Sequence, residues 1–336
     1  MKKIRFIVII LIAATAFAFV ACNRNNSRSG GTASTPATTT APASGGLDTW
    51  TRVADTTFDG RSITAIAYGG NRWVAGGGGG RIAYSTDKGV TWTRAADSTI
   101  WNYGRDKIDI RGIAYGNNRF VAVGGFGRMA YSADGVSWTA IADSGFGTST
   151  ICAIAWGNNR FVAVGSFGKI AYSADGVSWT AIADSTLGNS ISYAIAFGNN
   201  RWVAVNWAGK MAYSPDGVSW TAVADSTFDS NVTIKIAAIA FGNNRFVAGG
   251  YGEMAYSADG INWTAVPRGG TYSIAWGNNR FVAGEQGGRM EYSTDGATWT
   301  RVADSAFGSS NIDGIAYGSG RFVAVGQSGT IAYADW

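Results

Sequence analysis

The stretch that decides the fold is IAYGNNRFVAVGGFGRMAYSADGVSWTAI, residues 113–141. It contains four short runs of strand-forming residues, separated by Gly-Asn-Asn, by a glycine-rich turn and by Ser-Ala-Asp-Gly. Asn-Asn and Asp-Gly suit tight hairpins because these residues tolerate a positive φ. The stretch therefore predicts four antiparallel strands, at residues 113–115, 119–123, 128–131 and 136–141.

The same pattern recurs along the chain. The phrase Ile-Ala-aromatic-Gly occurs seven times, and successive copies are 47, 41, 41, 44, 35 and 41 residues apart. Seven four-stranded units of this length predict a seven-bladed β-propeller, with a straight solenoid as the rival architecture. The copies begin at Ile66, Ile113, Ile154, Ile195, Ile239, Ile274 and Ile315.

The position of a Trp-Thr pair favours the closed ring over the solenoid. Six units have this pair in their last run, and a seventh copy, Trp50-Thr51, precedes the first phrase. The final unit stops at Trp336, before it could form its own fourth strand. We therefore expect the N-terminal strand at residues 50–53 to complete the last blade and remove the open sheet edges. The prediction is a single all-β domain at residues 47–336, built of four-stranded antiparallel blades.

Composition supports this fold class and excludes several kinds of chemistry. Glycine supplies 48 of 336 residues, and charged residues are only 15% of the chain, against a usual share of about 25%. The absence of histidine excludes Ser-His-Asp catalysis and His-ligated metals. The two cysteines are too few for a disulfide framework or a structural zinc site. We expect neither a cofactor nor a metal.

The N-terminus has the pattern of an export signal. A basic start at residues 2–5 precedes an apolar run at residues 6–21, which is shorter than the roughly 20 residues of a membrane-spanning helix. The run ends in Phe19-Val20-Ala21-Cys22, which resembles the lipobox of bacterial lipoproteins. The resemblance implies a signal peptide at residues 1–21, cleavage before Cys22, and lipidation of Cys22. An ordinary secretory signal cut after Ala21 is the alternative.

Residues 22–46 follow as a predicted tether. They are rich in Ser, Thr, Ala, Gly and Pro and contain no large apolar side chain, so they cannot bury enough surface to fold. A flexible segment of this length reaches about 25–30 Å. We expect a lipid-anchored protein of the bacterial cell envelope, facing either the periplasm or the cell surface. Removal of the signal would lower the formal net charge from +5 to +2, so no basic patch for nucleic acid is expected.

A second motif is repeated in the turn before the last run of each unit. Residues 85–92, STDKGVTW, match the Asp-box pattern S-x-D-x-G-x-T-W, and the other copies are one residue shorter. Over residues 47–336 the chain is therefore similar to the Asp-box (BNR, sialidase-like) repeat propellers. Because the motif recurs from unit to unit, we interpret its aspartates as structural hydrogen-bond acceptors within their own turns. They are Asp87, Asp134, Asp175, Asp216, Asp259 and Asp295.

The resemblance leaves catalysis open, because that family includes sialidases, other glycosidases and noncatalytic assembly factors. A sialidase needs clustered arginines and a Tyr/Glu nucleophile pair, and its usual Arg-Ile-Pro-type motif does not occur here. A typical glycosidase needs two carboxylates placed across the sugar. The candidates Glu253, Glu285 and Asp313 are scattered along the sequence, without evident partners. We therefore predict no enzymatic activity, with glycoside hydrolysis as the class to test.

One arginine follows the first turn of each unit. Seven such arginines could form an anion-binding ring, but the first and third turns of a blade lie on the same face of a propeller. We therefore expect these arginines to pair with the Asp-box carboxylates. They are Arg72, Arg119, Arg160, Arg201, Arg245, Arg280 and Arg321.

The turns on the opposite face differ between units and give the candidate binding site. Four consecutive units place an aromatic side chain in the turn between the second and third strands: Phe126, Phe167, Trp207 and Tyr251. The longest inter-unit connection, residues 97–112, adds Trp101 and Tyr103 on the same face. Exposed aromatics suit a sugar or an apolar protein surface, whereas the alternative is that they cap the blade interfaces. Cys152, in an innermost strand, is expected to be a small buried hydrophobe.

The sequence thus favours a noncatalytic, membrane-anchored binding or assembly platform, expected to be a monomer with an envelope protein or glycan as its partner. A surface lectin that uses the aromatic turns is the first alternative. A sialidase-like hydrolase is the second.

Overall fold

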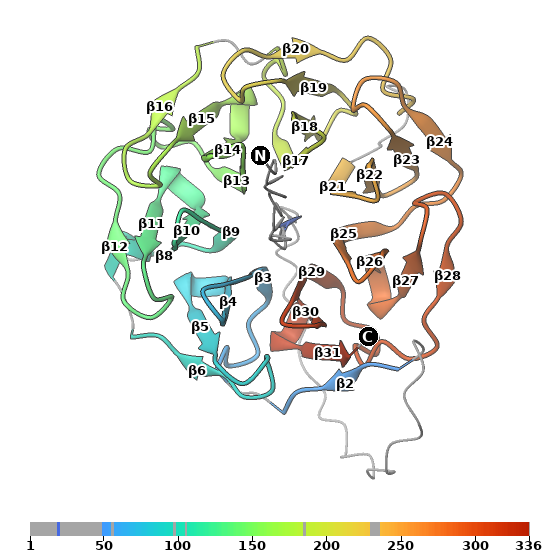
Figure 1. The fold of residues 1–336 in the computed structure, drawn as a ribbon. Helices are drawn as coiled ribbons and strands as arrows, with labels where there is room; N and C mark the ends of the chain where they lie inside the picture. The colour runs from blue at the N-terminus through green and yellow to red at the C-terminus, as the bar shows by residue number, and fades with distance from the viewer. Residues whose placement is uncertain are drawn as a thin grey trace, which may run out of the picture.

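The computed structural model describes residues 49–54, 57–96, 99–104, 106–183, 186–228 and 236–335, together with the backbone of the two-residue strand β1 (Phe19–Val20). Apart from β1, the predicted signal peptide at 1–21 lies outside the described residues. So does the predicted tether at 22–46, which begins with Cys22. Seven antiparallel four-stranded sheets stand in a ring around a central axis, and β1 adds to the inner edge of the seventh (Figure 1). The fold is the predicted seven-bladed propeller, and its described residues include no α-helix.

Each blade has an innermost strand at the axis and an outermost strand at the rim (Figure 1). The innermost strands are β3 (Ile63–Gly69), β9 (Ile110–Gly116), β13 (Ile151–Gly157), β17 (Ser192–Gly198), β21 (Ile236–Gly242), β25 (Thr271–Gly277) and β29 (Ile312–Gly318). The second strands are β4 (Arg72–Gly77), β10 (Arg119–Gly124), β14 (Arg160–Gly165), β18 (Arg201–Asn206), β22 (Arg245–Gly250), β26 (Arg280–Glu285) and β30 (Arg321–Gly326). The third strands are β5 (Ile82–Ser85), β11 (Met129–Ser132), β15 (Ile170–Ser173), β19 (Met211–Ser214), β23 (Met254–Ser257), β27 (Met290–Ser293) and β31 (Ile331–Asp335). The outermost strands are β6 (Thr93–Arg94), β12 (Thr139–Ala140), β16 (Thr180–Ala181), β20 (Thr221–Ala222), β24 (Thr264–Val266), β28 (Thr300–Arg301) and β2 (Thr51–Arg52).

The ring is closed by the N-terminal strand, as predicted. β2 pairs antiparallel with β31, with Thr51 opposite Tyr333 (Figure 1). The backbone N–H of Trp50 donates to the carbonyl of Asp304 at 3.0 Å, and the Trp50 side chain is buried. The seventh blade therefore has four strands like the others, and β2 covers the outer edge of β31.

The phrase Ile-Ala-aromatic-Gly is explained by packing between blades. The aromatic ring of each phrase lies on the glycine that ends the innermost strand of the preceding blade, so that a Cβ on this glycine would overlap the ring. The contact closes on itself, because the glycine of the seventh blade receives the tyrosine of the first. The pairs are Gly69–Tyr115, Gly116–Trp156, Gly157–Phe197, Gly198–Phe241, Gly242–Trp276, Gly277–Tyr317 and Gly318–Tyr68.

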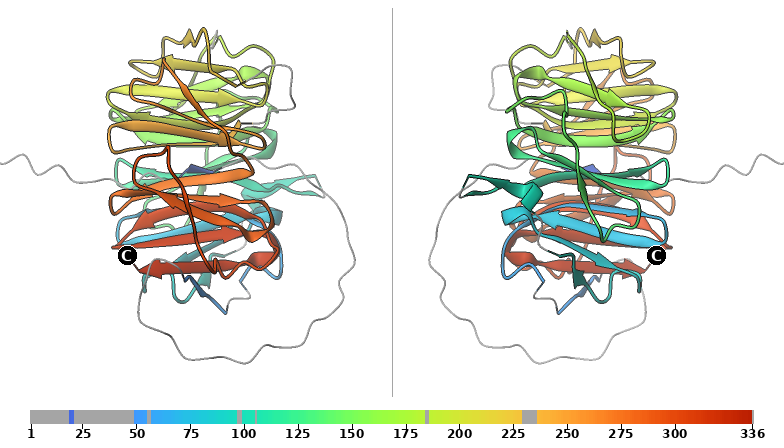
Figure 2. Two further views of the ribbon diagram at one scale, coloured as in Figure 1. Left: turned by 90° about the vertical axis from the view of Figure 1, so that its right-hand side faces the viewer. Right: turned by 90° about the vertical axis from the view of Figure 1, so that its left-hand side faces the viewer.

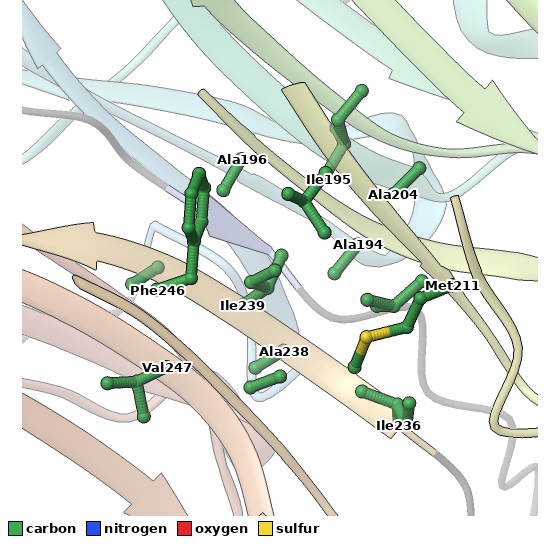
Figure 3. Close-up of a cluster of buried hydrophobic side chains, with 14 of the residues drawn as sticks. Ala194, Ile195, Ala196, Ala204, Met211, Ile236, Ala238, Ile239, Phe246 and Val247 are labelled. Atoms are coloured by element: carbon green, nitrogen blue, oxygen red, sulfur yellow. The ribbon is translucent and has the colours of Figure 1, made fainter. Parts of the chain in front are cut away.

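The core lies between the blades. Small and large side chains alternate along the inner strands, so adjacent sheets interdigitate. Figure 3 shows this at the interface of the fourth and fifth blades, where Ile195 of β17 and Ile239 of β21 lie among alanines, with Met211 and Phe246 at the sides. Burial of these apolar faces, repeated around the ring, is the main favourable contribution to folding.

Two features break the sevenfold regularity. The connection predicted at residues 97–112 ends before β9, which begins at Ile110. It includes the 3-10 turn η2 (Thr99–Trp101) and a small hairpin of β7 (Asn102–Tyr103) and β8 (Asp106–Lys107), which projects from one face of the disc (Figure 2). At the axis, β1 pairs with β29 and lies near all seven innermost strands. Within the described part of the chain, no helix is long and apolar enough to cross a membrane.

Candidate functional site

The two faces of the disc are built from different connections. One face holds the Asn-rich first turns and the Asp-boxes, and we call it the Asp-box face. The other, the loop face, holds the turns between second and third strands and the connections between blades. Hydrogen bonds join these two kinds of segment, as from Ser166 N–H to the carbonyl of Thr150 (2.9 Å) and from Gln327 N–H to that of Asn311 (3.0 Å).

On the Asp-box face, each aspartate is engaged by its own turn. The hydroxyl of Ser173 donates to Asp175 at 2.9 Å and accepts from the N–H of Gly176 at 2.8 Å. Asp175 Oδ1 also accepts from the N–H groups of Val177 and Ser178, both at 2.8 Å. The other five boxes have corresponding networks around Asp87, Asp134, Asp216, Asp259 and Asp295.

These hydrogen bonds shift the acidity of the aspartates. Partial burial alone would raise the pKa of Asp175 and Asp259, but the N–H groups of their turns stabilise the carboxylates and lower each pKa to about 2. At Asp134 the backbone N–H of Ser137 is the largest contribution, and it lowers the pKa. The carboxylates are therefore ionised, and their oxygens already accept hydrogen bonds from their own turns. This arrangement suits a structural role and not proton transfer.

The seven arginines pair with the Asp-box face in a way that differs from the prediction. Three guanidinium groups reach the next blade's Asp-box and donate to the backbone carbonyl of its aspartate: Arg72 to Asp134, Arg201 to Asp259 and Arg245 to Asp295. Arg321 of the last blade donates to the carbonyl of Lys88 in the first at 2.9 Å. The direct bond of these arginines thus goes to the carbonyl before the box glycine, while the charges of Arg72, Arg160 and Arg245 also lower the pKa of the aspartate in the next box. Each arginine also lies over a tyrosine of its own third strand: Arg72–Tyr84, Arg119–Tyr131, Arg160–Tyr172, Arg201–Tyr213, Arg245–Tyr256, Arg280–Tyr292 and Arg321–Tyr333.

The loop face contains a ring of residues that the sequence analysis missed. Every innermost strand has a β-bulge at its second residue, near the connection from the preceding blade. Whereas the following phrase is almost invariant from blade to blade, this position is not. The sequence feature that could have identified these residues is the variation of one position within an otherwise constant repeat. We call these residues the bulge ring: Thr64, Arg111, Cys152, Tyr193, Ala237, Tyr272 and Asp313.

The four aromatic turn residues divide into two pairs. Phe126 and Phe167 are 45% and 65% exposed, and the ring of Phe126 is stacked at 4.2 Å on Tyr103, itself 44% exposed. Trp207 and Tyr251 are half-buried: Trp207 packs against Tyr193 at 4.9 Å between ring centroids, and its own ring is 6.2 Å from that of Tyr251. The structure therefore offers Phe126, Phe167 and Tyr103 as contact residues, while Trp207 and Tyr251 also support the face.

Two other residues singled out in the sequence are in the interior. Trp101 is 1% exposed, and its side chain lies against Gly80 and Gly124. The expectation that Trp101 contacts a ligand is therefore wrong: it fixes the base of the hairpin whose exposed ring is Tyr103. Cys152 is buried and packs with Tyr193, as expected for a small hydrophobe.

Glu285, which had no evident partner in the sequence, lies in a cluster of charged residues in the sixth blade. Arg268, in the connection before this blade, forms an ion pair with Glu291, and its Nη2 is 3.9 Å from Glu285 Oε1. Glu291 also lies opposite Arg301 in the ladder between β27 and β28. A cavity of about 310 Å³ on the loop face is lined by Gly269, Gly270, Glu285, Gln286, Gly287 and Arg289.

The other two acidic candidates are placed differently. Asp313 is a buried member of the bulge ring. Glu253 lies in the turn between β22 and β23, next to the connection before the sixth blade. Among the described residues, no group of three or more potential ligands could hold a metal ion. The loop face thus combines exposed aromatic rings and a charged cavity, which is an arrangement suited to binding. Five of the seven bulge-ring residues are buried beneath this face.

No model of a known protein family matches the sequence, and no curated protein matches it either. Among solved structures, the chain is similar to YCF48 bound to a D1 peptide, with 19% identity, a TM-score of 0.67, and coverage of 85% of this chain and 97% of that chain. It is also similar to YCF48 from Cyanidioschyzon merolae, with 20% identity, a TM-score of 0.64, and coverage of 85% and 98%. The extracellular domain of the putative hybrid two-component system BT4673 from B. thetaiotaomicron matches with 11% identity, a TM-score of 0.67, and coverage of 86% and 40%. These likenesses establish a seven-bladed propeller fold for the chain.

Proposed function

We propose that the protein is a noncatalytic binding or assembly platform of the bacterial cell envelope, which is anchored through lipidated Cys22 and engages a partner polypeptide on its loop face. The observation behind this proposal is the distribution of sequence differences among the blades. The Asp-box face repeats the same hydrogen bonds around the ring, whereas the bulge ring, the turns and the connections of the loop face differ from blade to blade. A repeat that varies on one face alone favours a recognition surface there.

The chemistry of the loop face fits a polypeptide. Phe126, Phe167 and Tyr103 supply exposed aromatic surface, which is enriched at the energetic centres of protein interfaces. The charged cavity of the sixth blade lies on the same face. YCF48, a propeller of the same fold, has been solved bound to a D1 peptide, so this architecture is compatible with a peptide partner.

The binding test uses a photo-crosslinking amino acid placed in the full, anchored chain in whole cells. At position 167 on the loop face, we expect a discrete crosslinked product that protease treatment removes. Val90, which is 40% exposed on the Asp-box face, is the matched control position, and it should give no such product. Equal crosslinking from both positions, or none from position 167, would contradict the proposal.

The anchoring test is independent of the partner. Replacement of Cys22 by Ser should move the protein from the membrane fraction to the soluble fraction and abolish the incorporation of labelled fatty acid. Retention of the Cys22→Ser variant in membranes would show that the anchor is elsewhere. A screen for glycoside hydrolysis on the purified chain tests the noncatalytic part, since turnover of any glycoside would overturn it.

A glycan is the second candidate partner, because the stacked pair Tyr103 and Phe126 and the exposed ring of Phe167 also suit a sugar face. A glycan array separates the two. Binding that is lost in the double variant Phe126→Ala, Phe167→Ala and kept in Val90→Ala would favour a lectin over a protein platform.

A further inference from the structure

The last residue of the second strand is unusual in the sixth blade. Five blades have glycine at this position, and at four of these glycines a Cβ would collide with a backbone carbonyl of the incoming connection. In the sixth blade the residue is Glu285, and the connection before it is Gly269-Gly270. Gly270 has a φ of 102°, which only glycine adopts readily. The short Gly-Gly connection therefore follows its own path, and it accommodates a side chain at position 285.

The fourth blade also departs from glycine, and it shows how a structural substitute behaves. Asn206 accepts from the N–H groups of Ala208 and Lys210 at 3.0 and 2.9 Å, and its amide donates to the carbonyl of Leu187 at 3.0 Å. Glu285 has no such role: it is 5% exposed, and its Oε1 is buried without a hydrogen-bond partner. The side chain of Asn206 is satisfied by its own turn, whereas that of Glu285 is not.

The nearby arginine compensates for this burial only in part. Arg268 is engaged in its ion pair with Glu291, lies over the ring of Trp299 and reaches Glu285 only at 3.9 Å. Burial raises the pKa of Glu285 even though Arg268, Arg289 and Arg301 act to lower it. A buried carboxylate without a direct partner costs stability, which a suitable ligand would restore.

A second glutamate flanks the same connection. Gly270 N–H donates to the carbonyl of Gly250 at 2.8 Å, and Gly250 N–H donates to that of Glu253 at 3.0 Å. Glu253 Oε2 is likewise buried without a hydrogen-bond partner. The chain has only three glutamates, and the two that lie beside the Gly269-Gly270 connection each have an oxygen in need of a donor.

We propose that the cavity of the sixth blade receives the cationic side chain of a lysine or arginine from the partner polypeptide, with Glu285 as its acceptor. This inference rests on the proposed function, because it specifies the chemistry of that partner. A cation supplies the missing hydrogen-bond donor, and it brings a positive charge closer to the carboxylate than Arg268, which lies at 3.9 Å. The glycine walls at 269, 270 and 287 allow a long, unbranched side chain to approach closely. Arg289 is exposed at the cavity, and its charge opposes the ligand.

The experiment follows the three glutamate carboxyl groups by NMR in the full chain labelled with ¹³C-glutamate, with Glu285→Gln to assign the signal of Glu285. The probes are Nα-acetyl-lysine methylamide and Nα-acetyl-arginine methylamide, with the norleucine analogue as the neutral comparator. We expect either cationic probe to lower the pKa of Glu285 and to perturb the amide signals of Gly269, Gly270 and Gly287. The norleucine analogue should do neither.

Two variants give the direction of the electrostatic effect. Glu285→Gln should weaken binding of the cationic probes by about tenfold or more, since it removes a charge-assisted hydrogen bond. Arg289→Ala should strengthen it by about twofold, as expected for the loss of one exposed, solvent-screened positive charge. Weaker binding in Arg289→Ala, or a response to methyl glucoside in place of the cations, would overturn the inference in favour of a polar, uncharged ligand. A lack of response to every probe would also overturn it.

Failure of this inference is distinguishable from failure of the proposed function. If Glu285→Gln leaves crosslinking from position 167 unchanged and the probes do not bind, the loop face remains the docking surface and only the cation pocket is wrong. If crosslinking from position 167 is absent while the cationic probes bind, the cation pocket is supported. The proposal that a partner polypeptide docks on the loop face is then wrong.

Discussion

The Asp-box face and the loop face are made by the same repeat, yet they use their polar groups differently. On the Asp-box face, acceptors such as the Asp175 carboxylate and the carbonyl of Asp134 are engaged by donors of the same turn or of the preceding blade. On the loop face, Glu285 is buried with an oxygen that has no hydrogen-bond partner, and Phe167 is 65% exposed. The first arrangement is self-sufficient, and the second leaves bonding capacity and apolar surface for a partner.

The difference assigns stability to one face and recognition to the other. Substitutions on the Asp-box face should change the free energy of unfolding without changing partner binding, and exposed loop-face substitutions should do the opposite. The seam of the ring and the half-buried aromatics are the places where this division can fail.

The largest effect is expected at the seam. Deletion of residues 49–54 removes β2 and the buried Trp50, and it leaves β31 as an unpaired edge at the rim. An open, partly apolar edge promotes aggregation, so we expect a poorly folded or aggregated protein in size-exclusion chromatography and thermal melts. Deletion of six residues from the tether, 30–35, is the control. A seam deletion that melts like the parent would mean that closure is unnecessary.

Trp207 tests whether all loop-face aromatics belong to the recognition surface. Its ring packs against Tyr193 and lies near Tyr251, so Trp207→Ala should lower the free energy of unfolding by about 2–3 kcal/mol, as for other partly buried aromatic truncations. Chemical denaturation measures this. A change below about 0.5 kcal/mol, the range of ordinary surface substitutions, would move Trp207 from the supporting residues to the contact residues.

Asp175 tests the Asp-box face through pH. Asp175→Ala removes an acceptor of several hydrogen bonds and should cost about 1–2 kcal/mol at pH 7. Because the pKa of Asp175 is lowered from 3.8 to about 2 on folding, its contribution is fully present above pH 3.8 and is lost as the pH falls through 2. The difference between parent and variant in urea denaturation should therefore shrink with acid. Asp106→Ala, in the exposed hairpin of the loop face, should show no such difference. If the difference in free energy of unfolding between parent and Asp175→Ala were the same at all pH values, the ionic role of Asp175 would be contradicted.

The fold was predictable because the same short motifs, with the same packing and turn-forming residues, recur in every blade. The phrase Ile-Ala-aromatic-Gly marks inter-blade packing such as Gly69 on Tyr115, and Trp50-Thr51 marks the closing strand. The direct acceptor of the Arg72 guanidinium was not predictable because sequence gives the face of a residue but not whether a carboxylate or a carbonyl of the next blade is nearer. The carboxylate of Glu285 had no evident partner in the sequence because Arg268, which neighbours both Glu285 and Glu291, lies outside the repeated phrases.

Burial was the property of the loop face that sequence could not supply. Trp101 and Tyr103 are two residues apart in an irregular connection, yet one is 1% and the other 44% exposed. The 3-10 turn η2 and the hairpin decide this difference, and neither has a strong periodic pattern to predict it.

The smallest effect on stability is expected at Phe167, and it gives the sharpest test of the division between faces. Its side chain is 65% exposed, so Phe167→Ala should change the free energy of unfolding by no more than about 0.5 kcal/mol. If the ring contacts the partner, its removal should nevertheless weaken binding by tenfold or more, the typical loss when an interface anchor is truncated. Stability is measured by chemical denaturation, and binding by competition of the variant with the parent for the partner crosslinked at position 167. Val90→Ala, which removes an exposed apolar side chain from the Asp-box face, should change neither quantity. Unchanged binding in Phe167→Ala would leave its exposure unexplained by recognition, and a large loss of stability would place the ring in the packing of the blades.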